Sequence, residues 1–286
     1  MNLQQHLDHF VTHGWTVFPA VHAEPAMQRW REAYAPLCRQ ASLPGQPPVT
    51  WLGNLFEADP GLFMPVVWQP QLLDFAEQAM GPFVQIDSTA LNVFPTVDPA
   101  QAAGRVNGQV NGWHRDRYAF VPQTRDYIRP ICLNTITYLQ NLTAANGPLR
   151  VIPGSHRDPV VFSADERQRP HPREQLLEPK AGDVVVTHGL LAHSGTPNLS
   201  GQPRYFLSAS LNLCWLRQRD SFGGPRCQAL IADARARGDR RLLRLLGEDD
   251  QRWDRSNPYF HTDDDSTCWQ RWVDEDRAAL ITPLLA

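Results

Sequence analysis

The middle of the chain alternates short apolar runs with clusters of Gly, Pro and Asn, and this pattern constrains the fold more than any other feature. Between residues 83 and 216, the runs are rich in β-branched residues or alternate apolar with polar side chains. Such runs, bounded by turn-forming residues, predict antiparallel strands rather than alternating strands and helices. The predicted strands span 84–94, 131–142, 149–152, 183–187 and 205–216. We therefore expect a mainly β fold of the jelly-roll or barrel type.

Helical periodicity flanks the strand region on both sides. Leu3, Leu7 and Phe10 fall on one helical face near the start of the chain. The other predicted helices span 26–39, 71–80, 228–236, 240–246 and 268–280. We expect one domain over residues 1–286, with a helical N-terminal part (1–82), a barrel core (83–216) and a helical C-terminal extension (217–286). The extension is a candidate surface for forming a homo-oligomer.

The composition excludes several classes of protein. With 42% hydrophobic and 20% charged residues and a formal net charge of −3, the chain fits neither a disordered protein nor a nucleic-acid-binding surface. It has no apolar stretch near the roughly 18 residues of a membrane-spanning helix, and its start lacks the features of a signal peptide. The five cysteines are scattered and form no CxxC pair, as reduced thiols would. We expect a cytoplasmic protein without a membrane or nucleic-acid partner.

A histidine followed two residues later by an aspartate is the first sign of a metal site. On an extended strand both side chains point to one face, so an imidazole nitrogen and a carboxylate oxygen can reach one ion. The pattern alone is weak evidence because it occurs four times. The four pairs are His6 and Asp8, His114 and Asp116, His156 and Asp158, and His261 and Asp263.

The surroundings of each pair favour His114 and Asp116, which begin a strand-like region. The pair at residues 6 and 8 falls in a predicted helix, where an offset of two separates the side chains. The pair at 261 and 263 falls in an acidic loop, so we expect both of these pairs on the surface. The pair at 156 and 158 follows a Pro-Gly-Ser turn.

A third ligand must come from another strand, and the candidates are His188 and His193. They are an odd number of residues apart, so on one regular strand they point to opposite faces unless a bulge intervenes. Small residues follow His193, which favours it. Two histidines and one carboxylate form the facial triad that leaves open positions on Fe(II). A non-oxidative metal site of a hydrolase or isomerase, and a barrel that binds a ligand without turnover, remain alternatives.

Four motifs in one order resemble the phytanoyl-CoA dioxygenase family of iron- and 2-oxoglutarate-dependent oxygenases. They are GWHRD at 112–116, NGPLRVIPGSH at 146–156, GDVV at 182–185, and residues 193–198 followed by Arg204. The resemblance extends over about residues 7–212. It implies a double-stranded β-helix, which is a distorted jelly-roll barrel.

The resemblance also implies roles for individual residues. His114, Asp116 and His193 would hold Fe(II). Arg204 would bind the far carboxylate of 2-oxoglutarate, in agreement with the match between a planar guanidinium and a carboxylate. Asn92, at the end of a predicted strand, would donate an amide hydrogen bond to the same molecule.

One position departs from the family pattern. Members often carry a hydroxyl two residues after the second histidine, where this chain has Gly195. Ser194 or Thr196 would then supply the hydroxyl for the cosubstrate.

The implied reaction consumes O2 and 2-oxoglutarate, releases succinate and CO2, and hydroxylates a C–H bond of a small organic molecule. Related halogenases lack the carboxylate ligand, so Asp116 favours hydroxylation. The substrate would be an amino-acid-like molecule, a natural product or another metabolite. Two polar loops, 96–112 and 157–180, are expected to form mobile lids. The candidate substrate contacts are Trp113, Arg117, Tyr118 and Phe120.

Overall fold

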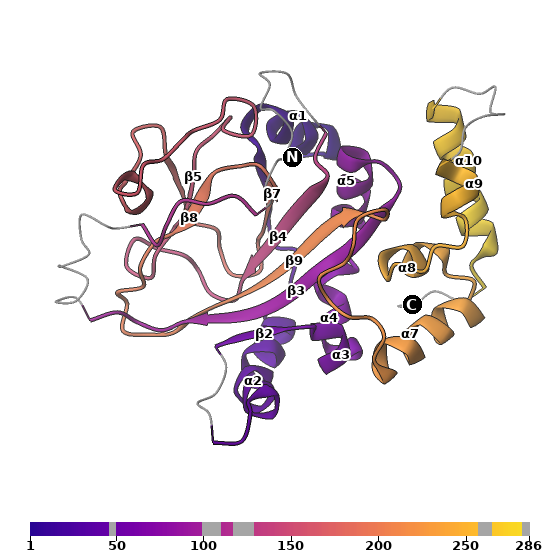
Figure 1. The fold of residues 1–286 in the computed structure, drawn as a ribbon, viewed down its shortest axis with the longest axis horizontal. Coiled ribbons are helices and arrows are strands. Elements are labelled where there is room, and N and C mark those ends of the chain that lie inside the picture. Colours follow the sequence, from indigo (N-terminus) through magenta and orange to yellow (C-terminus); the bar gives the residue numbers. More distant parts are fainter. Residues whose placement is uncertain (46–49, 99–109, 117–128, 257–264, 282–286) are drawn as a thin grey trace.

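Two antiparallel sheets form the β region of the computed structural model, which describes residues 1–45, 50–98, 110–116, 129–256 and 265–281 (Figure 1). The large sheet has the strand order β1-β7-β4-β9-β3-β2 and the small sheet the order β6-β5-β8. The large sheet contains β1 (Trp15–Phe18), β7 (Val184–His188), β4 (Cys132–Tyr138), β9 (Arg204–Leu213), β3 (Val84–Phe94) and β2 (Trp51–Gly53). The small sheet contains β6 (Gln175–Leu177), β5 (Leu149–Val151) and β8 (His193–Gly195). The five predicted strands are all present, and the mainly β fold with flanking helices is confirmed. Among the described residues the strands form two sheets and not one closed barrel.

Both edges of the large sheet come from the N-terminal part of the chain. Strand β1 pairs with β7, with Trp15 opposite Thr187, and β2 pairs with β3, with Trp51 opposite Asn92. The sequence analysis expected a helical part over residues 1–82 and did not predict these two strands. Strands of three or four residues carry too little alternation to be recognised, and they form because a distant strand offers its free backbone groups.

Helices cover the outer face of the large sheet, as Figure 1 shows. Helix α1 starts with a capping box between Asn2 and Gln5 and ends at Gly14, whose φ of 83° suits a residue without a Cβ. The other N-terminal helices are α2 (Glu24–Ala41), α3 (Leu55–Ala58), α4 (Pro60–Val67) and α5 (Pro70–Met80), and α1 spans Leu3–His13. Helices α1, α2 and α5 were predicted, whereas α3 and α4 were not.

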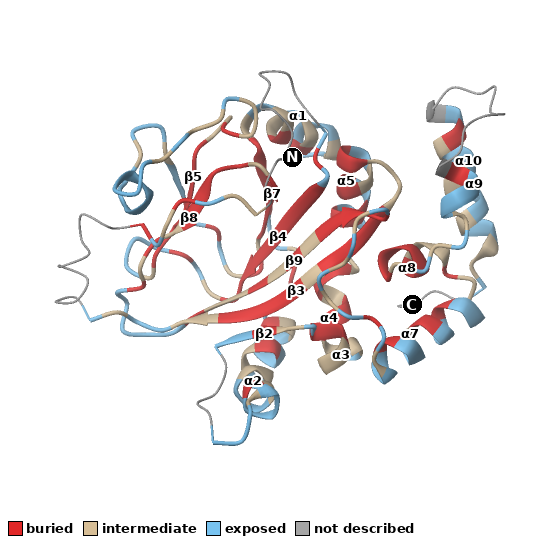
Figure 2. Cartoon of the chain, in the orientation of Figure 1, coloured by how far each residue is buried: buried red, intermediate tan, exposed pale blue. Residues whose placement is uncertain are grey.

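Buried side chains lie on both faces of the central strands, which are red along most of their length in Figure 2. On the outer face, Leu207, Leu211 and the aromatic rings of α1 and α5 belong to the largest buried cluster. On the inner face, Ile136 and Tyr138 of β4 pack with Leu149 and Val151 of β5, which lie in the small sheet. The two sheets thus enclose a second apolar layer, and burial on both faces explains the nearly continuous apolar sequence of these strands.

His6 contradicts the expectation that it lies on the surface. Its side chain is buried, its ring stacks on Phe18 at 3.9 Å between centroids, and its Nδ1 lies 2.8 Å from Oγ1 of Thr16. The reason is that α1 packs directly on β1, and His6 shares its inward helix face with Phe10, four residues later.

The C-terminal helices pack on the same side of the molecule. They are α7 (Pro225–Ala236), α8 (Arg240–Leu245), α9 (Arg252–Ser256) and α10 (Asp265–Ala279), of which only α9 was not predicted. Helix α7 packs against α3 and α4, and α8 packs against α7 and β3. Leu242 and Leu245 belong to the same buried cluster as Phe10 and Phe75. None of the helices in the described ranges combines the length and apolar character that a bilayer crossing needs.

The two predicted lid loops have different outcomes. Most of loop 96–112 lies outside the described residues. Loop 157–180 is largely exposed, as expected, but it contains the short helix Glu166–Gln168 and strand β6, so it is partly built into the small sheet. All five cysteines are buried, and none of them forms a disulfide in the described part of the chain.

Candidate functional site

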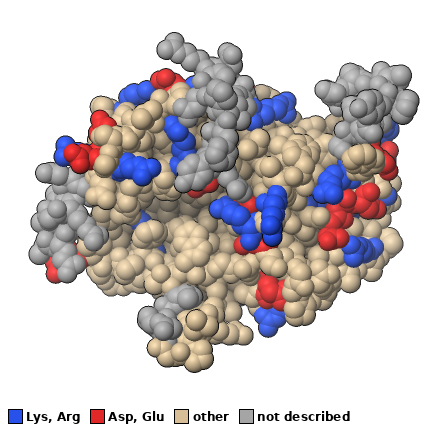
Figure 3. All heavy atoms as spheres, viewed as in Figure 1, with Lys and Arg blue, Asp and Glu red and all other residues tan. Residues whose placement is uncertain are grey.

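The candidate site lies where residue 114 joins the free edge of the small sheet. The backbone N–H of His114 donates to the carbonyl of His193 at 3.0 Å, and the N–H of His193 donates back at 3.0 Å. This pairing places the two imidazole rings side by side, with centroids 4.3 Å apart. Figure 3 shows the molecular surface hollowed between the two sheets.

Asp116 completes a group of three possible ligands. One ligand atom from each of His114, Asp116 and His193 lies within 4.8 Å of the other two. Nε2 of His193 and Oδ1 of Asp116 are 3.7 Å apart. Two imidazoles and one carboxylate, held on one side of an ion, are the donor set that suits a non-haem Fe(II) with open positions.

Hydrogen bonds orient all three side chains. Nδ1–H of His114 donates to the carbonyl of Gly112, and Nδ1–H of His193 donates to that of Leu191, both at 3.0 Å. Each ring therefore presents Nε2 as its acceptor atom. Asn134 donates from Nδ2 to Oδ2 of Asp116 at 3.0 Å, which leaves Oδ1 directed to the histidines.

The electrostatic surroundings favour neutral imidazole at this point. Desolvation of the ring and the neighbouring His193 lower the pKa of His114 below its ordinary value, although a carbonyl and Asp116 oppose the shift. Because a metal binds only the unprotonated nitrogen, a lowered pKa keeps the ring competent to coordinate at neutral pH.

His188 lies in a different part of the molecule. Its ring stacks on Phe10 of α1 at 5.8 Å between centroids and lies 5.0 Å from the ring of His156. Residue 188 ends β7 of the large sheet, whereas residue 193 begins β8 of the small sheet. The structure therefore brings His193, and not His188, to His114 and Asp116.

Arg204 is a buried cation without a carboxylate partner among the described residues. It begins β9 and is only 3% exposed, and its guanidinium lies over the ring of Phe94 at 4.7 Å. Its Nη1 donates to the carbonyls of Asn146, Gly147 and Thr196. Nε is buried and has no hydrogen-bond partner in the described part of the chain. Burial lowers the pKa of this guanidinium.

Asn92 lies on the same face of the large sheet as Arg204. It is opposite Phe206 in the pairing of β3 with β9, two positions from the pair of Phe94 and Arg204. The side chain is 2% exposed, and neither its amide nitrogen nor its amide oxygen has a hydrogen-bond partner within the described ranges. Buried amides usually have such partners, so this one is suited to a bound polar molecule.

The hydroxyls of Ser194 and Thr196 have other partners. Oγ of Ser194 accepts from the N–H of Gly112 at 3.1 Å and donates to the carbonyl of Gly195 at 3.1 Å. Oγ1 of Thr196 accepts from Nε of Arg150 at 2.8 Å, and Arg150 forms an ion pair with Glu174. Both hydroxyls therefore support the loops around the site.

Trp113 packs in a cluster of its own next to the site. It is 2% exposed, stacks on Phe162 at 5.7 Å between centroids, and donates from Nε1 to the carbonyl of Arg169 at 2.9 Å. These contacts anchor the histidine-bearing segment to loop 157–180, so we do not assign Trp113 to substrate contact. Arg117, Tyr118 and Phe120 lie outside the described residues.

Asn134 is the residue of the site that the sequence analysis missed. It lies on β4 and faces the same side as Ile136 and Tyr138, between the two sheets. An asparagine within an apolar strand was the available signal, because a buried amide at such a position needs a partner.

Several known proteins are similar to this chain in sequence. The sequence pattern of the phytanoyl-CoA dioxygenase (PhyH) family matches residues 10–206. Phytanoyl-CoA dioxygenase 1 of Oryza sativa subsp. japonica is 36% identical over 90 residues, which are 28% of this chain and 32% of the rice protein. The match thus spans about a third of that relative's length. L-proline trans-4-hydroxylase of Streptomyces griseoviridis is 24% identical over 231 residues, covering 70% of this chain and 82% of that protein.

A solved structure supports the fold. HygX from Streptomyces hygroscopicus, crystallised with nickel and 2-oxoglutarate, superposes with a TM-score of 0.61 at 16% identity, covering 75% of this chain and 88% of HygX. Because the family pattern matches well over half of the chain and includes the described His-Asp-His group, the protein belongs to the phytanoyl-CoA dioxygenase family of iron- and 2-oxoglutarate-dependent oxygenases.

Proposed function

We propose that the protein hydroxylates a C–H bond of a small organic molecule, with His114, Asp116 and His193 as iron ligands and with Arg204 and Asn92 binding 2-oxoglutarate. The observation that carries the proposal is the set of two imidazoles and one carboxylate within 4.8 Å of one another. Iron bound there would supply O2 activation coupled to decarboxylation of 2-oxoglutarate.

The spacing between the ligands and Arg204 supports the same cosubstrate. His193 and Gly195 lie on the same face of β8, about 7 Å apart along the strand. A Cβ at Gly195 would lie 3.5 Å from Nη2 of Arg204. A five-carbon keto diacid bound through its keto end to the metal would therefore place its far carboxylate near the guanidinium.

The residues around the iron would orient the ligands, bind the far carboxylate and exclude water. Hydrogen bonds from the two imidazole Nδ1 atoms and from Asn134 hold three ligand atoms on one side of the ion. Arg204 offers Nε and Nη2 as a planar pair of donors, which matches the two oxygens of a carboxylate. The apolar layer between the sheets keeps water from the inner wall of the site.

Amino acids are the first substrates to test. One relative carries the name L-proline trans-4-hydroxylase. Candidate substrates are screened for succinate formation above the uncoupled rate, and the product is examined for the gain of one oxygen. The identity of the substrate is decided by that screen.

The central experiment is binding of 2-oxoglutarate to the protein loaded with Fe(II) under anaerobic conditions. We expect saturable binding by isothermal titration, with the weak visible absorption of a chelated keto acid. Absence of binding to the iron-loaded protein would refute the proposal. A hydrolase or isomerase would work without the keto acid, and a non-catalytic binding protein would form no succinate.

Two histidine variants test the ligand assignment. His193→Ala should lose nearly all iron, since His114 and Asp116 alone form an incomplete site. His188→Ala should keep its iron and lose about 1 kcal/mol of unfolding free energy, because it removes packing against Phe10 and the hydrogen bond that Nδ1 of His188 accepts from the N–H of Leu190, and no iron ligand. Full iron in His193→Ala, with none in His188→Ala, would reverse the assignment.

Three expectations remain predictions: the single-domain organisation, the cytoplasmic location and a homo-oligomer through residues 217–286. Size-exclusion chromatography with light scattering on the full chain, compared with a variant carrying charged substitutions on the outer side of α10, tests the last of these.

A further inference from the structure

We propose that the side chain of Asn111 is a second hydrogen-bond donor to the far carboxylate of 2-oxoglutarate, acting beside Arg204. The inference rests on the function proposed above and assigns a role to a residue with no motif of its own. Asn111 lies three positions before His114, on the segment that joins the small sheet at its free edge.

The missing side chain of Gly195 creates the place for this amide. A Cβ built on Gly195 would lie 3.0 Å from Nδ2 of Asn111 and 3.5 Å from Nη2 of Arg204. The carboxamide and the guanidinium therefore approach the same point above the backbone of β8. A side chain at residue 195 would compete with the amide for this space.

The backbone fixes the position of Asn111 relative to Gly195. The N–H of Asn111 donates to the carbonyl of Gly195 at 2.9 Å. The N–H of the next residue, Gly112, donates to Oγ of Ser194 at 3.1 Å. These two bonds hold the segment along β8, so the side chain of residue 111 starts from a defined point next to Arg204.

Arg204 is arranged to share an anion with another donor. Its Nη1 is occupied by three backbone carbonyls, which leaves the edge formed by Nε and Nη2 for a carboxylate. A carboxylate has more acceptor positions than one guanidinium edge fills. Nη2 is the Arg204 atom nearest the Cβ position of Gly195, so an oxygen bound to Nη2 lies on the side where Asn111 can donate.

The neighbouring hydroxyls do not compete for this role. Ser194 bonds the backbone of residues 112 and 195, and Thr196 accepts from Arg150. Asn111 is exposed in the structure, so its amide can rotate to present its N–H groups to a bound anion.

The test compares two keto acids that differ only at the far end. 2-Oxopentanoate has a methyl group where 2-oxoglutarate has its far carboxylate. We expect Asn111→Ala, loaded with Fe(II) under anaerobic conditions, to bind 2-oxoglutarate about tenfold more weakly than the unaltered protein by isothermal titration. Its affinity for 2-oxopentanoate should change by less than about twofold, because that ligand makes no use of the donor.

Three further variants separate a lost donor from a disturbed loop. Asn111→Asp keeps the size and replaces the donor with an anion, so it should weaken 2-oxoglutarate binding more than the alanine variant. Gly195→Ser should also weaken binding, since the new side chain displaces the amide; Gly195 is a β8 residue whose φ is outside the left-handed region, so the backbone accepts serine. The double variant Asn111→Ala with Gly195→Ser should recover affinity, because the serine hydroxyl then has room to donate.

The outcomes that would overturn the inference are specific. Unchanged 2-oxoglutarate affinity in Asn111→Ala would show that the amide is not a donor. Equal weakening for both keto acids would show a structural role for the segment. If the unaltered iron-loaded protein binds no 2-oxoglutarate at all, the proposed function itself fails, which distinguishes the two claims.

Discussion

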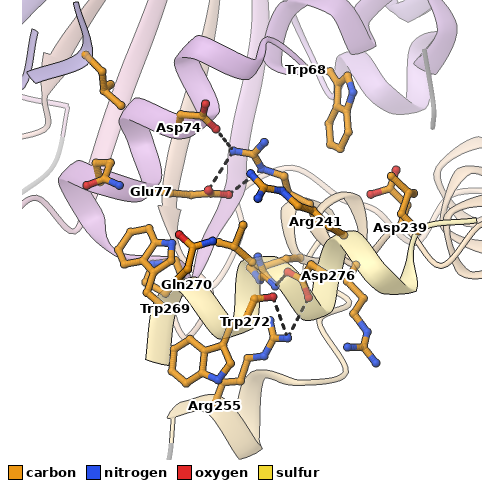
Figure 4. A pocket seen from close by; sticks show the side chains of 18 residues that line it. Trp68, Asp74, Glu77, Asp239, Arg241, Arg255, Trp269, Gln270, Trp272 and Asp276 are labelled. Carbon is orange, nitrogen blue, oxygen red and sulfur yellow. Dashed lines mark hydrogen bonds and ion pairs between the residues drawn. The ribbon is translucent and has the colours of Figure 1, made fainter. Parts of the chain in front are cut away.

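Arginines occupy buried or half-buried positions in two regions of this molecule, and their partners differ. In the C-terminal extension, Arg241 reaches across to α5 and bonds both Asp74 and Glu77, at distances of 2.7–3.0 Å (Figure 4). Nearby, Arg255 pairs with Asp276 and lies over the ring of Trp272. In the candidate site, the contacts of Arg204 within the described ranges are with carbonyls and a ring.

The pKa values of Arg244 and Arg204 are shifted in opposite directions by these different partners. Burial by itself would lower the pKa of Arg244, but the carboxylates of Asp249 and Asp276 raise it above the ordinary value for arginine. Arg204 has no such compensation, and burial lowers its pKa. A guanidinium whose carboxylates belong to the chain holds helices together, whereas one with only carbonyl partners is suited to bind an anion from outside.

Removing Arg244 should have the largest effect on stability. Arg244→Met removes the ion-pair partner of the buried Asp249 carboxylate and one of the two arginine partners of Asp276. This should cost about 3–5 kcal/mol of unfolding free energy. Urea denaturation measures the loss. Arg277→Met is the matched control, because the side chain of Arg277 is 74% exposed and its removal should cost less than about 0.5 kcal/mol. If Arg244→Met weakened the affinity for 2-oxoglutarate and left the unfolding free energy unchanged, the proposed difference between the two regions would be wrong.

Removing Arg204 should weaken 2-oxoglutarate binding strongly and lower the unfolding free energy only slightly. Arg204→Met should weaken 2-oxoglutarate binding about a hundredfold, because a desolvated carboxylate loses its only cation. The unfolding free energy should fall by only about 1–2 kcal/mol, since carbonyls and no carboxylates lose a partner. Isothermal titration and urea denaturation measure the two quantities, with iron content as the control. A stability loss as large as that of Arg244→Met would make Arg204 a structural residue.

Asn134 tests whether a neutral side chain can matter as much as a cation. Asn134→Ala frees Asp116 to rotate, and we expect metal affinity to fall about tenfold to a hundredfold. Titration with Mn(II) in the presence of 2-oxoglutarate measures this. At saturating metal the affinity for 2-oxoglutarate should stay the same, because Arg204 is untouched. Unaltered metal affinity would mean that Asp116 needs no support.

Two histidines differ from these arginines because burial favours their uncharged form. Burial lowers the pKa of His22 to about 4, and that of His156 falls to the same range. The unfolded chain takes up these protons near the ordinary histidine pKa of 6.5 whereas the folded chain does not, so stability is full above pH 6.5 and declines below it. We expect a loss of about 1–2 kcal/mol per histidine between pH 6.5 and 5. Urea midpoints across this range should show a shallower decline for His22→Gln, and a flat profile in the unaltered protein would contradict the assignment.

The long strands and the histidine motifs could be predicted because their signals are local. Strand β3 was predicted with its observed bounds, Val84–Phe94, from its own sequence alone. The order of four motifs was enough to select His114, Asp116, His193 and Arg204, which the structure places around one region.

Other features depend on contacts that no local pattern contains. Strands β1 and β2 are short and acquire their conformation from β7 and β3. His6 is buried because a helix packs on a strand formed later in the sequence. Asn111 became a candidate only when Gly195 was found next to its amide. In each case the deciding contact is with a different element of the structure. Periodicity within one segment of the sequence therefore cannot reveal it.

The edge strands of the large sheet have a consequence for how the protein is made. Residue 15 leaves the ribosome long before residue 187, which is its partner in β7. Strand β2, around residue 51, similarly pairs with β3 at residues 90–92. During synthesis Trp15 and its neighbours therefore stay unpaired until β7 has been made. Because such distant pairings are slow and leave apolar edges exposed, we expect β1 to close the sheet late in folding, after the central strands have assembled.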